Sequence, residues 1–202
     1  MDELVVKDLI DRLIDLSFAE DIGDGDHTTL SCIPADAMGK SKLLIKEEGI
    51  LAGIEVAKEV FRRFDPTMKV EVFIQDGTHV KPGDVAMVVE GKVQSLLQTE
   101  RLMLNIMQRM SGIATMTNKY VKKLEGTKTR VLDTRKTTPG MRIMEKMAVS
   151  SSPDIWAVSM PCSSKQTPIP RSLSSRTAIR LSLVFRANRA VDFVRTLSVR
   201  PL

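Results

Sequence analysis

The stretch LDTRKTTPGMR, at residues 132–142, combines three cationic side chains with three threonine hydroxyls. The apolar residues before it predict a strand over Thr129–Asp133, and Pro139-Gly140 predicts a turn that returns the chain to a helix. Ligands of α/β folds bind just beyond the carboxyl ends of strands, and adjacent guanidinium and ammonium groups suit carboxylates and phosphates. From the residues alone, an anion-binding loop and a solvated basic loop explain this stretch equally well.

A methionine-rich segment precedes that stretch. Its spacing predicts a helix from about Gln94 to Met110 and a second helix from about Ala114 to Leu124. Arg101 lies beside an apolar stripe on the first helix, where an ion pair with a nearby carboxylate is its simplest role. The stripe is predicted to be core or subunit contact and comprises Leu102, Met103, Ile106, Met107 and Met110.

The residues before position 94 alternate between helical and strand patterns separated by Gly/Asp turns. Together they predict a mixed α and β fold with a core of ordinary size for this length. The predicted helices lie at about 3–18 and 54–64, the strands at 43–45, 70–74, 79–80 and 85–89, and the turns at 20–29, 76–77 and 81–84.

Residues 151–202 differ sharply in composition from the rest of the chain. They hold Lys165 and seven arginines against two aspartates, so the net charge of +5 belongs to this segment and residues 1–150 are close to neutral. The segment has no glycine, histidine or glutamate, and no nucleic-acid motif with interleaved aromatic residues, which argues against a nucleic-acid partner. We expect irregular structure here, with a helix near Ala178–Val194.

Targeting and redox features point to an ordinary intracellular protein. No apolar run reaches membrane-spanning length, and the first 18 residues are amphipathic and acidic, unlike a signal peptide. Cys32 and Cys162 are far apart and lack the spacing of a disulfide framework or a zinc motif. We therefore predict a cytoplasmic protein without a membrane partner.

Five segments, in order, resemble the quinolinate phosphoribosyltransferase family, also called carboxylating nicotinate-nucleotide pyrophosphorylases. The resemblance covers essentially all of residues 1–150, and TRKTTPGMR is its most specific part. The segments are EDIGDGDHTT at 20–29, LAGIEVAKEVF at 51–61, DGTHVKPGD at 76–84, ERLMLNIMQRMSGIAT at 100–115 and LDTRKTTPGMR at 132–142.

The resemblance implies an α/β (α+β) fold in which an N-terminal α/β sandwich is followed by the start of an incomplete, TIM-like α/β barrel. The sandwich would span residues 1–112 and the beginning of the barrel residues 113–150, with residues 151–202 as a tail outside the family pattern. An unfinished barrel would leave the flank and edge of the strand at 129–133 exposed, which invites aggregation or pairing with another chain.

The family's reaction transfers a phosphoribosyl group from 5-phosphoribosyl 1-diphosphate, used with Mg²⁺, to quinolinate. Nicotinate mononucleotide, carbon dioxide and pyrophosphate result, a step of NAD biosynthesis. The resemblance implies a homodimer or higher homo-oligomer in which Arg101 reaches the neighbouring subunit's site. It places Arg135 and Lys136 on the pyridine dicarboxylate and the phosphates, with Thr137 and Arg142 as secondary contacts. His27 is interpreted as structural or exposed.

The family pattern stops near Ser150, where a glycine-rich turn and an Asn-His-Arg cluster should follow. Back-translation of residues 160–167, read one base earlier, permits the peptide DAVLIKAN, which resembles the family's missing strand ending in Leu-Ile-Lys. We therefore hypothesise a reading-frame error near Ser150, with natural divergence of the tail as the alternative. Two other functions stay open, a non-enzymatic truncated remnant and a molybdenum-transport-type phosphoribosyltransferase-like protein.

Overall fold

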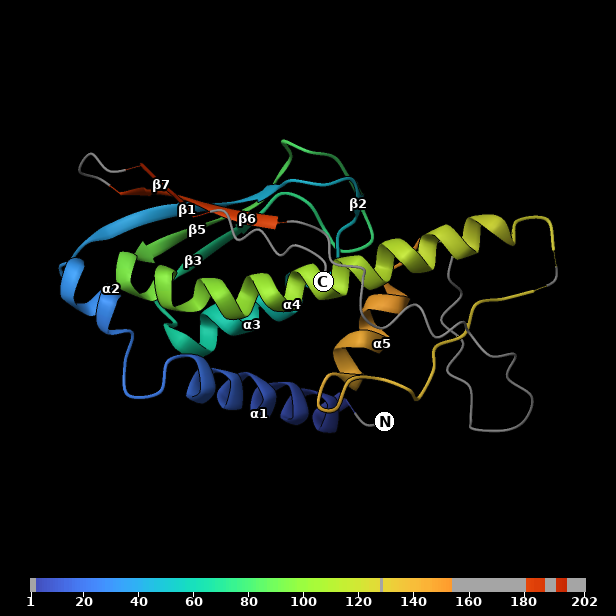
Figure 1. Ribbon diagram of the computed structural model, residues 1–202, viewed down its shortest axis with the longest axis horizontal. Coiled ribbons are helices and arrows are strands. Elements are labelled where there is room, and N and C mark those ends of the chain that lie inside the picture. Colours follow the sequence, from blue (N-terminus) through green and yellow to red (C-terminus); the bar gives the residue numbers. More distant parts are fainter. Residues whose placement is uncertain (1–2, 128, 154–180, 188–191, 196–202) are drawn as a thin grey trace.

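The computed structural model describes residues 3–127, 129–153, 181–187 and 192–195, the last two ranges as strands without their side chains. Helices and strands are mixed along the chain, as the sequence predicts (Figure 1). The helices are α1 Glu3–Asp21, α2 His27–Cys32, α3 Ile54–Phe64, α4 Val93–Lys123 and α5 Arg142–Ser150. The strands are β1 Met38–Ile45, β2 Gly49–Ile50, β3 Lys69–Val72, β4 His79–Val80, β5 Val85–Lys92, β6 Leu181–Ala187 and β7 Asp192–Arg195.

The main sheet has the order β3-β5-β1-β6-β7, and every neighbouring pair in it is antiparallel. β1 pairs with β5 from Met38 opposite Lys92 onward, with an irregularity between Leu43 and Leu44. Its burial alternates strictly over most of its length, so one face meets the core and the other is exposed. A second, two-stranded sheet joins β2 to β4.

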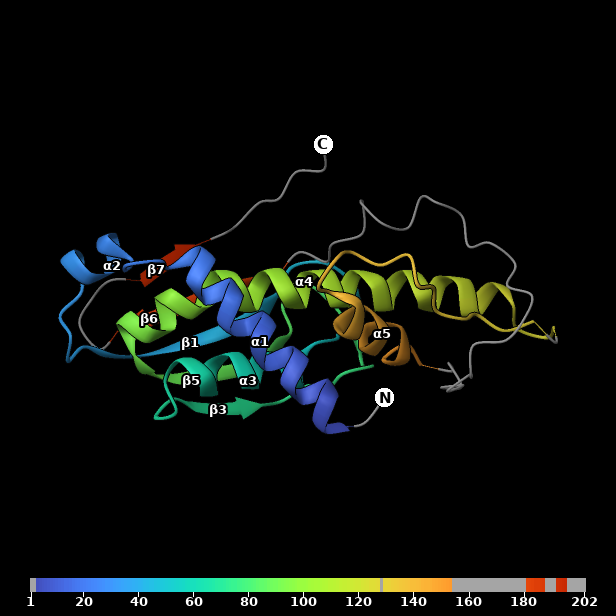
Figure 2. The ribbon, with the colours of Figure 1, turned by 90° about the horizontal axis from the view of Figure 1, so that it is seen from below.

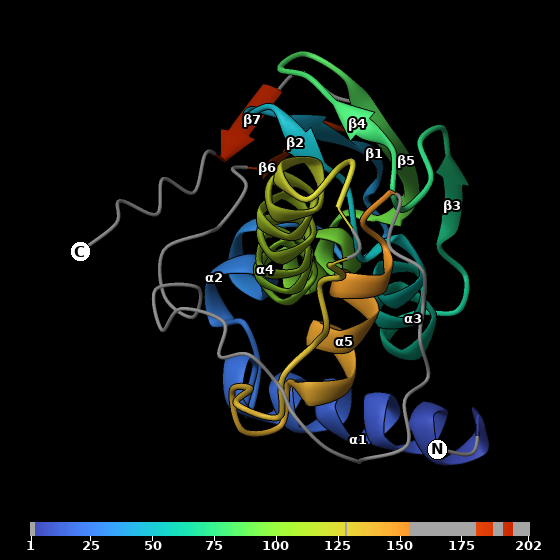
Figure 3. The ribbon, with the colours of Figure 1, turned by 90° about the vertical axis from the view of Figure 1, so that its right-hand side faces the viewer.

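Helices cover one face of the main sheet in two successive layers. α3 and α4 lie directly under the sheet, and α1 lies beyond them on the side away from the strands (Figures 1 and 3). α1 is held to α3 by the Phe18–Phe64 ring pair, with centroids 5.1 Å apart, and by the fork of Arg63 on Asp15. The core between sheet and helices includes Leu43, Ile45, Phe61, Met87, Leu96 and Leu104.

α4 runs unbroken through the position where two helices were predicted. The predicted break at residues 111–113 is wrong because Ser111 and Gly112 are buried within the helix and keep it packed against the 49–53 segment. The Ser111 hydroxyl accepts from the Ala52 amide at 2.9 Å and donates to the Ala52 carbonyl at 3.1 Å. The Thr115 hydroxyl accepts from the Ile50 amide at 2.8 Å. The methionine stripe of α4 is confirmed as core.

Two glycines, Gly53 and Gly77, have the positive φ angles that the segments 51–61 and 76–84 need for their turns. Gly53 has φ of 107°, and a Cβ at this position would lie 3.1 Å from Met110 Sδ and 3.4 Å from Met107 Cγ. α3 can therefore begin directly against α4. The Asp76 carboxylate accepts a hydrogen bond from the Ile54 amide at 2.9 Å at the start of α3. Burial raises the pKa of this carboxyl, and its effect exceeds the opposite effect of the hydrogen bonds from the Ile54 and Gly53 amides. Gly77, next to it, also has a positive φ, of 86°.

Three further expectations about secondary structure are wrong. Residues 129–133 form no strand, because the described residues place no second strand beside them to complete the hydrogen bonds. The expected open edge at this strand therefore does not exist. The helix expected near 178–194 is replaced by β6 and β7, since β6 completes the outer edge of β1 from Gly39–Ala187 to Ile45–Leu181. The turn at 20–29 leads into the unpredicted helix α2, which Asp26 caps through the Thr29 amide at 3.1 Å.

Other expectations are confirmed or lie outside the described residues. α3 and β4 match the predicted helix 54–64 and strand 79–80, and α5 follows the turn at Gly140. Residues 160–167, on which the reading-frame hypothesis depends, are not among the described residues. In the described part of the chain, every helix is too short or too polar to cross a bilayer.

Candidate functional site

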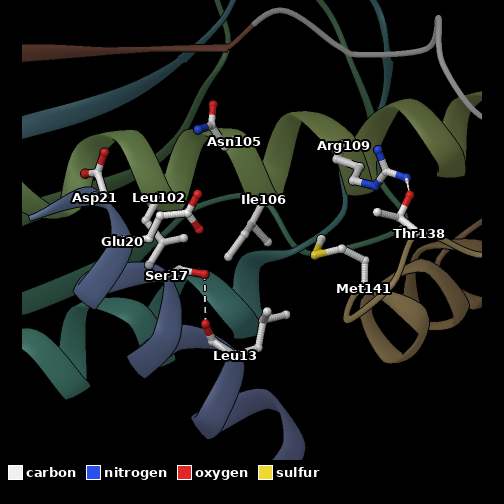
Figure 4. Close-up of a pocket in the computed structure, with 10 residues that line it drawn as sticks. All are labelled: Leu13, Ser17, Glu20, Asp21, Leu102, Asn105, Ile106, Arg109, Thr138 and Met141. Carbon is white, nitrogen blue, oxygen red and sulfur yellow. Dashed lines mark hydrogen bonds between the residues drawn. The ribbon is translucent and has the colours of Figure 1, made fainter.

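A cavity of about 450 Å³ lies between α1, α4 and the turn that precedes α5 (Figure 4). Its floor combines apolar side chains of α1 and α4, and polar groups stand at both ends. The lining residues are Leu13, Ser17, Glu20, Asp21, Leu102, Asn105, Ile106, Arg109, Thr138 and Met141. The C-terminal end of α1, one face of α4 and the end of the TRKTTPGMR stretch therefore all border the same cavity.

The turn at 138–141 is shaped by the residues that the sequence places there. The Met141 amide donates to the Thr138 carbonyl oxygen at 3.0 Å, and Gly140 has φ of 81°. With proline at the second position and glycine at the third, this is the geometry of a type II turn. A side chain at Gly140 would be strained, and its Cβ would also contact Leu13 of α1 at 3.7 Å. The turn thus leads the chain directly from the cationic segment into α5.

Arg109 joins this turn to α4 (Figure 4). Its Nη2 donates to the Thr138 hydroxyl at 2.5 Å, and its Nε donates to Glu145 Oε1 at 3.0 Å. Nη2 also donates to the same carboxylate oxygen of Glu145, which accepts in addition from the Thr138 amide at 3.4 Å. The carboxylate of Glu145 on α5 therefore accepts hydrogen bonds both from Arg109 of α4 and from the turn.

Arg101 lies next to Asp21, which lines the other end of the cavity. Its Nε donates to both carboxylate oxygens of Asp21 at 3.0 Å, and its Nη2 lies 3.6 Å from Asp26 Oδ2. This is the ion pair that the residues alone favour for Arg101. It ties α4 to the end of α1 and to the cap of α2, and about 30% of the Arg101 side chain stays exposed.

Like Arg101, the other predicted site residues do not line the cavity, although they are close in sequence to its lining residues Thr138 and Met141. Arg135, Lys136 and Arg142 are exposed and Thr137 is half-buried. The Lys136 amide donates to the Thr134 hydroxyl at 3.2 Å, a local turn that presents both cations outward. His27 is exposed, as expected, with Asp24 3.4 Å away. In the single chain, Arg101 is paired with Asp21 at the end of α1, whereas Arg135 and Lys136 lie in the segment before the 138–141 turn.

Arg109 and Glu145 were missed by the sequence prediction. Arg109 follows Arg101 by eight residues on α4, and so projects within about 80° of it around the helix axis. That spacing was the available signal, but its partner Glu145 is separated by 36 residues. No local pattern links the two, because their contact depends on how α5 packs against α4.

Metal binding by the protein itself finds no support among the described residues. No group of three or more His, Cys, Asp or Glu side chains there is arranged to hold an ion. Glu20 and Asp21 stand at the cavity, but Asp21 is engaged by Arg101.

Comparison with known proteins gives a consistent family assignment. Residues 26–111 match the quinolinate phosphoribosyl transferase N-terminal domain, and residues 113–152 match the C-terminal domain of the same family. The chloroplastic nicotinate-nucleotide pyrophosphorylase [carboxylating] of Oryza sativa subsp. japonica is 42% identical over 138 residues, which are 68% of this chain and 37% of that protein. A probable enzyme of the same name from Bacillus subtilis is 40% identical over 149 residues, 74% of this chain and 50% of that protein.

The fold agrees with solved structures of the same group. NadC from Streptococcus pyogenes superimposes with a TM-score of 0.67 at 35% identity, covering 75% of this chain and 52% of that one. The chain thus spans half or less of the length of these curated relatives. Over residues 26–152, the chain belongs to the quinolinate phosphoribosyl transferase family.

Proposed function

We propose that this chain takes part in phosphoribosyl transfer from 5-phosphoribosyl 1-diphosphate to quinolinate, with loss of carbon dioxide and pyrophosphate. The carrying observation is the pair Arg135 and Lys136, two exposed cations directly before a turn that is fixed to α4. The names of the relatives, which are carboxylating nicotinate-nucleotide pyrophosphorylases, support the same reaction.

The chemistry of the reaction explains why these groups suit it. Quinolinate carries two carboxylates, and the donor carries a diphosphate and a 5-phosphate, so both ligands are polyanions. A planar guanidinium binds a carboxylate with two parallel hydrogen bonds, whereas an ammonium acts as a compact charge for phosphate. Arg135 and Lys136 would bind and orient these anions, and cations near the departing pyrophosphate would stabilise the developing charge. Thr137 and Arg142 are proposed as secondary contacts.

Mg²⁺ is proposed to enter as a complex with the donor diphosphate. Mg²⁺ prefers oxygen ligands and often keeps substrate phosphates and water in its coordination shell.

A second copy of the chain is part of the proposal. Arg101 would bind anionic ligand in the site of a neighbouring subunit, and for this it would have to exchange its pair with Asp21 for the ligand. Such an exchange is feasible because the Arg101–Asp21 pair is about one third exposed, where ion pairs contribute little. A homodimer or higher homo-oligomer in the cytoplasm is the expected form.

Quinolinate binding by the full 202-residue chain tests the site. Titration calorimetry should show binding that weakens about tenfold or more in Arg135→Ala and in Lys136→Ala, since each removes a charged contact. Arg62→Ala, which removes an exposed arginine of α3, is the matched control and should bind as the parent does. Unchanged affinity in both site variants, or no binding by the parent, would contradict the proposed site.

Turnover is measured separately. The chain is incubated with quinolinate, 5-phosphoribosyl 1-diphosphate and Mg²⁺, and nicotinate mononucleotide is quantified. Product above background supports a working enzyme. Binding without product would make this chain a ligand-binding remnant of the family, and would refute the enzymatic part of the proposal.

A further inference from the structure

We propose that Arg109 and Glu145 are positioning residues that hold the Arg135–Lys136 segment in its ligand-binding conformation. The three-way contact of Arg109, Glu145 and Thr138 is called the latch below. The inference rests on the proposed function, because it assigns the latch to the cations that would bind quinolinate and the phosphates. It adds two residues that do not touch ligand themselves.

The latch joins three separate parts of the chain. Arg109 comes from α4, Glu145 from the first turn of α5 and Thr138 from the turn between them. Arg109 contacts both partners, at 2.5 Å to the Thr138 hydroxyl and 3.0 Å to Glu145, and Glu145 in turn accepts from the Thr138 amide. Every pair of members is therefore bonded, so the turn is fixed relative to both helices.

The surroundings of the latch distinguish it from an ordinary surface ion pair. The Glu145 side chain is 13% exposed and the Arg109 side chain 32%. Arg62 and Glu59 form a chemically equivalent pair, but they lie three residues apart on α3 and Arg62 is 57% exposed. Loss of the Arg62–Glu59 pair would leave the path of the chain unchanged. Loss of the latch would release a turn that is not paired with any of the described strands.

Chain geometry carries the effect from the latch to the cations. Each residue spans at most about 3.6 Å, so Lys136 cannot lie more than about 7 Å from the fixed Thr138, nor Arg135 more than about 11 Å. Behind the turn, α5 is anchored through buried Met144 and Ala148. With the latch closed, the cations sample a small volume beside the cavity, and less conformational entropy is lost when an anion binds.

The latch also occupies one end of the cavity itself. Arg109, Thr138 and Met141 line it together with Asn105 and Ile106 of α4 (Figure 4). Because Arg109 is held by Glu145 and Thr138, its charge is already compensated within the chain. Its contribution to binding therefore acts through the position of the segment, and not as another ligand-binding cation.

The experiment uses Glu145→Gln and Arg109→Lys in the full chain. The first keeps the shape of the side chain but weakens the charge-assisted bonds, and the second keeps the charge but removes the fork. Glu59→Gln and Arg62→Lys are the matched controls. Two quantities are measured for all five proteins: amide hydrogen exchange of peptides within 133–142, and the dissociation constant for quinolinate by calorimetry.

We expect both latch variants to exchange the 133–142 amides about tenfold faster or more and to bind quinolinate about tenfold more weakly. Exchange in α3 and β5 should match the parent, as should both quantities in the controls. Unchanged exchange in the latch variants would show that the contacts do not hold the segment. Faster exchange with unchanged affinity would show that holding the segment does not matter for binding.

Failure of the proposed function gives a different result. If the parent chain does not bind quinolinate, the proposed function and the positioning role fail together. If the parent binds, Arg135→Ala weakens binding and the latch variants do not, the proposed function stands and the latch inference alone is refuted.

Discussion

The two ends of α4 lie in different surroundings. Its first half runs beneath the main sheet, and the side chains from Leu102 to Leu104 and from Ile106 to Gln108 are buried there. Its last turn projects past the sheet, where Lys122 and Lys123 are exposed and the chain continues into the segment 124–141 (Figures 1 and 2). We call residues 38–110 the first region and residues 124–141 the second. The first region contains its own core, whereas the second is held by α5 and by polar contacts.

This difference explains what became of the predicted strand at 129–133. A strand needs a neighbour for its backbone hydrogen bonds, and the described residues place no strand beside 129–133, where Leu132 remains 37% exposed. β1, by contrast, has a partner on each side. Residues 38–110 can therefore form their structure from contacts present in the chain, while residues 129–133 have the sequence of a strand without forming one.

The largest expected effect comes from a matched pair of truncations in the two regions. Phe61→Ala removes a ring that is 1% exposed and should lower the free energy of unfolding by about 3–5 kcal/mol. Leu132→Ala should lower it by about 0.5 kcal/mol or less, since the side chain packs little. Urea denaturation followed by circular dichroism measures both. Equal losses would mean that the 124–141 segment is part of the same core.

A glycine in the first region that lies against the end of α5 gives the next effect. Gly77 has φ of 86°, and a Cβ there would lie 2.9 Å from the Ser151 carbonyl oxygen at the end of α5. Gly77→Ala should destabilise by about 2 kcal/mol, from backbone strain together with displacement of α5. Gly83→Ala is the control, because its φ of 97° brings the strain but no atom lies within 4 Å.

Hydrogen exchange separates the two contributions at Gly77. Faster exchange in 142–151 of Gly77→Ala, absent from Gly83→Ala, would show that the turn supports α5. Identical losses of stability and identical exchange in the two variants would mean that only backbone strain matters, and that the two regions do not support each other at this contact.

The sequence predicted the first region well for the same physical reason. Apolar periodicity reports which face of an element is buried, so the α4 stripe and α3 could be assigned before the fold was known. Arg109 and Glu145 could not, because a salt bridge across 36 residues depends on tertiary packing. β6 was missed because pairing with the edge of β1 decides its conformation, whereas the sequence alone predicted a helix near 178–194.

A smaller, pH-dependent effect is expected at the start of α4. Asp65 accepts from the Thr67 amide at 3.0 Å and from the hydroxyls of Thr67 and Ser95 at 2.6 and 2.7 Å. The hydrogen bond from the Thr67 hydroxyl is the main reason that the pKa of Asp65 is lowered from its ordinary 3.8. A lowered folded-state pKa contributes stability that is present above pH 3.8 and is lost as the pH falls through the folded value.

Asp65→Asn should therefore cost about 1 kcal/mol at neutral pH and flatten the acid limb of the stability profile. Urea midpoints of parent and variant, measured at half-unit steps between neutral pH and the acid unfolding limit, check this. Parallel profiles for parent and variant would show that Asp65 does not contribute to the acid sensitivity. Asp84→Asn serves as a control, since its carboxylate accepts a backbone bond in an exposed turn away from α4.

The smallest effect tests the second region by itself. Lys146 of α5 lies 3.0 Å from Asp133, and both side chains are more than one third exposed. Lys146→Met should change the global free energy of unfolding by about 0.5 kcal/mol or less, like Lys58→Met on α3, which breaks an exposed pair with Glu55.

The two variants should nevertheless differ in hydrogen exchange. Lys146→Met should speed exchange in 131–136, most clearly at low salt, because among the described residues no strand pairs with this segment when the ion pair is lost. Lys58→Met should leave exchange in α3 unchanged, since buried Val60 and Phe61 keep that helix in place. If neither variant alters local exchange, the 131–136 segment is held by packing after all, and the contrast between the two regions is smaller than the burial of their side chains indicates.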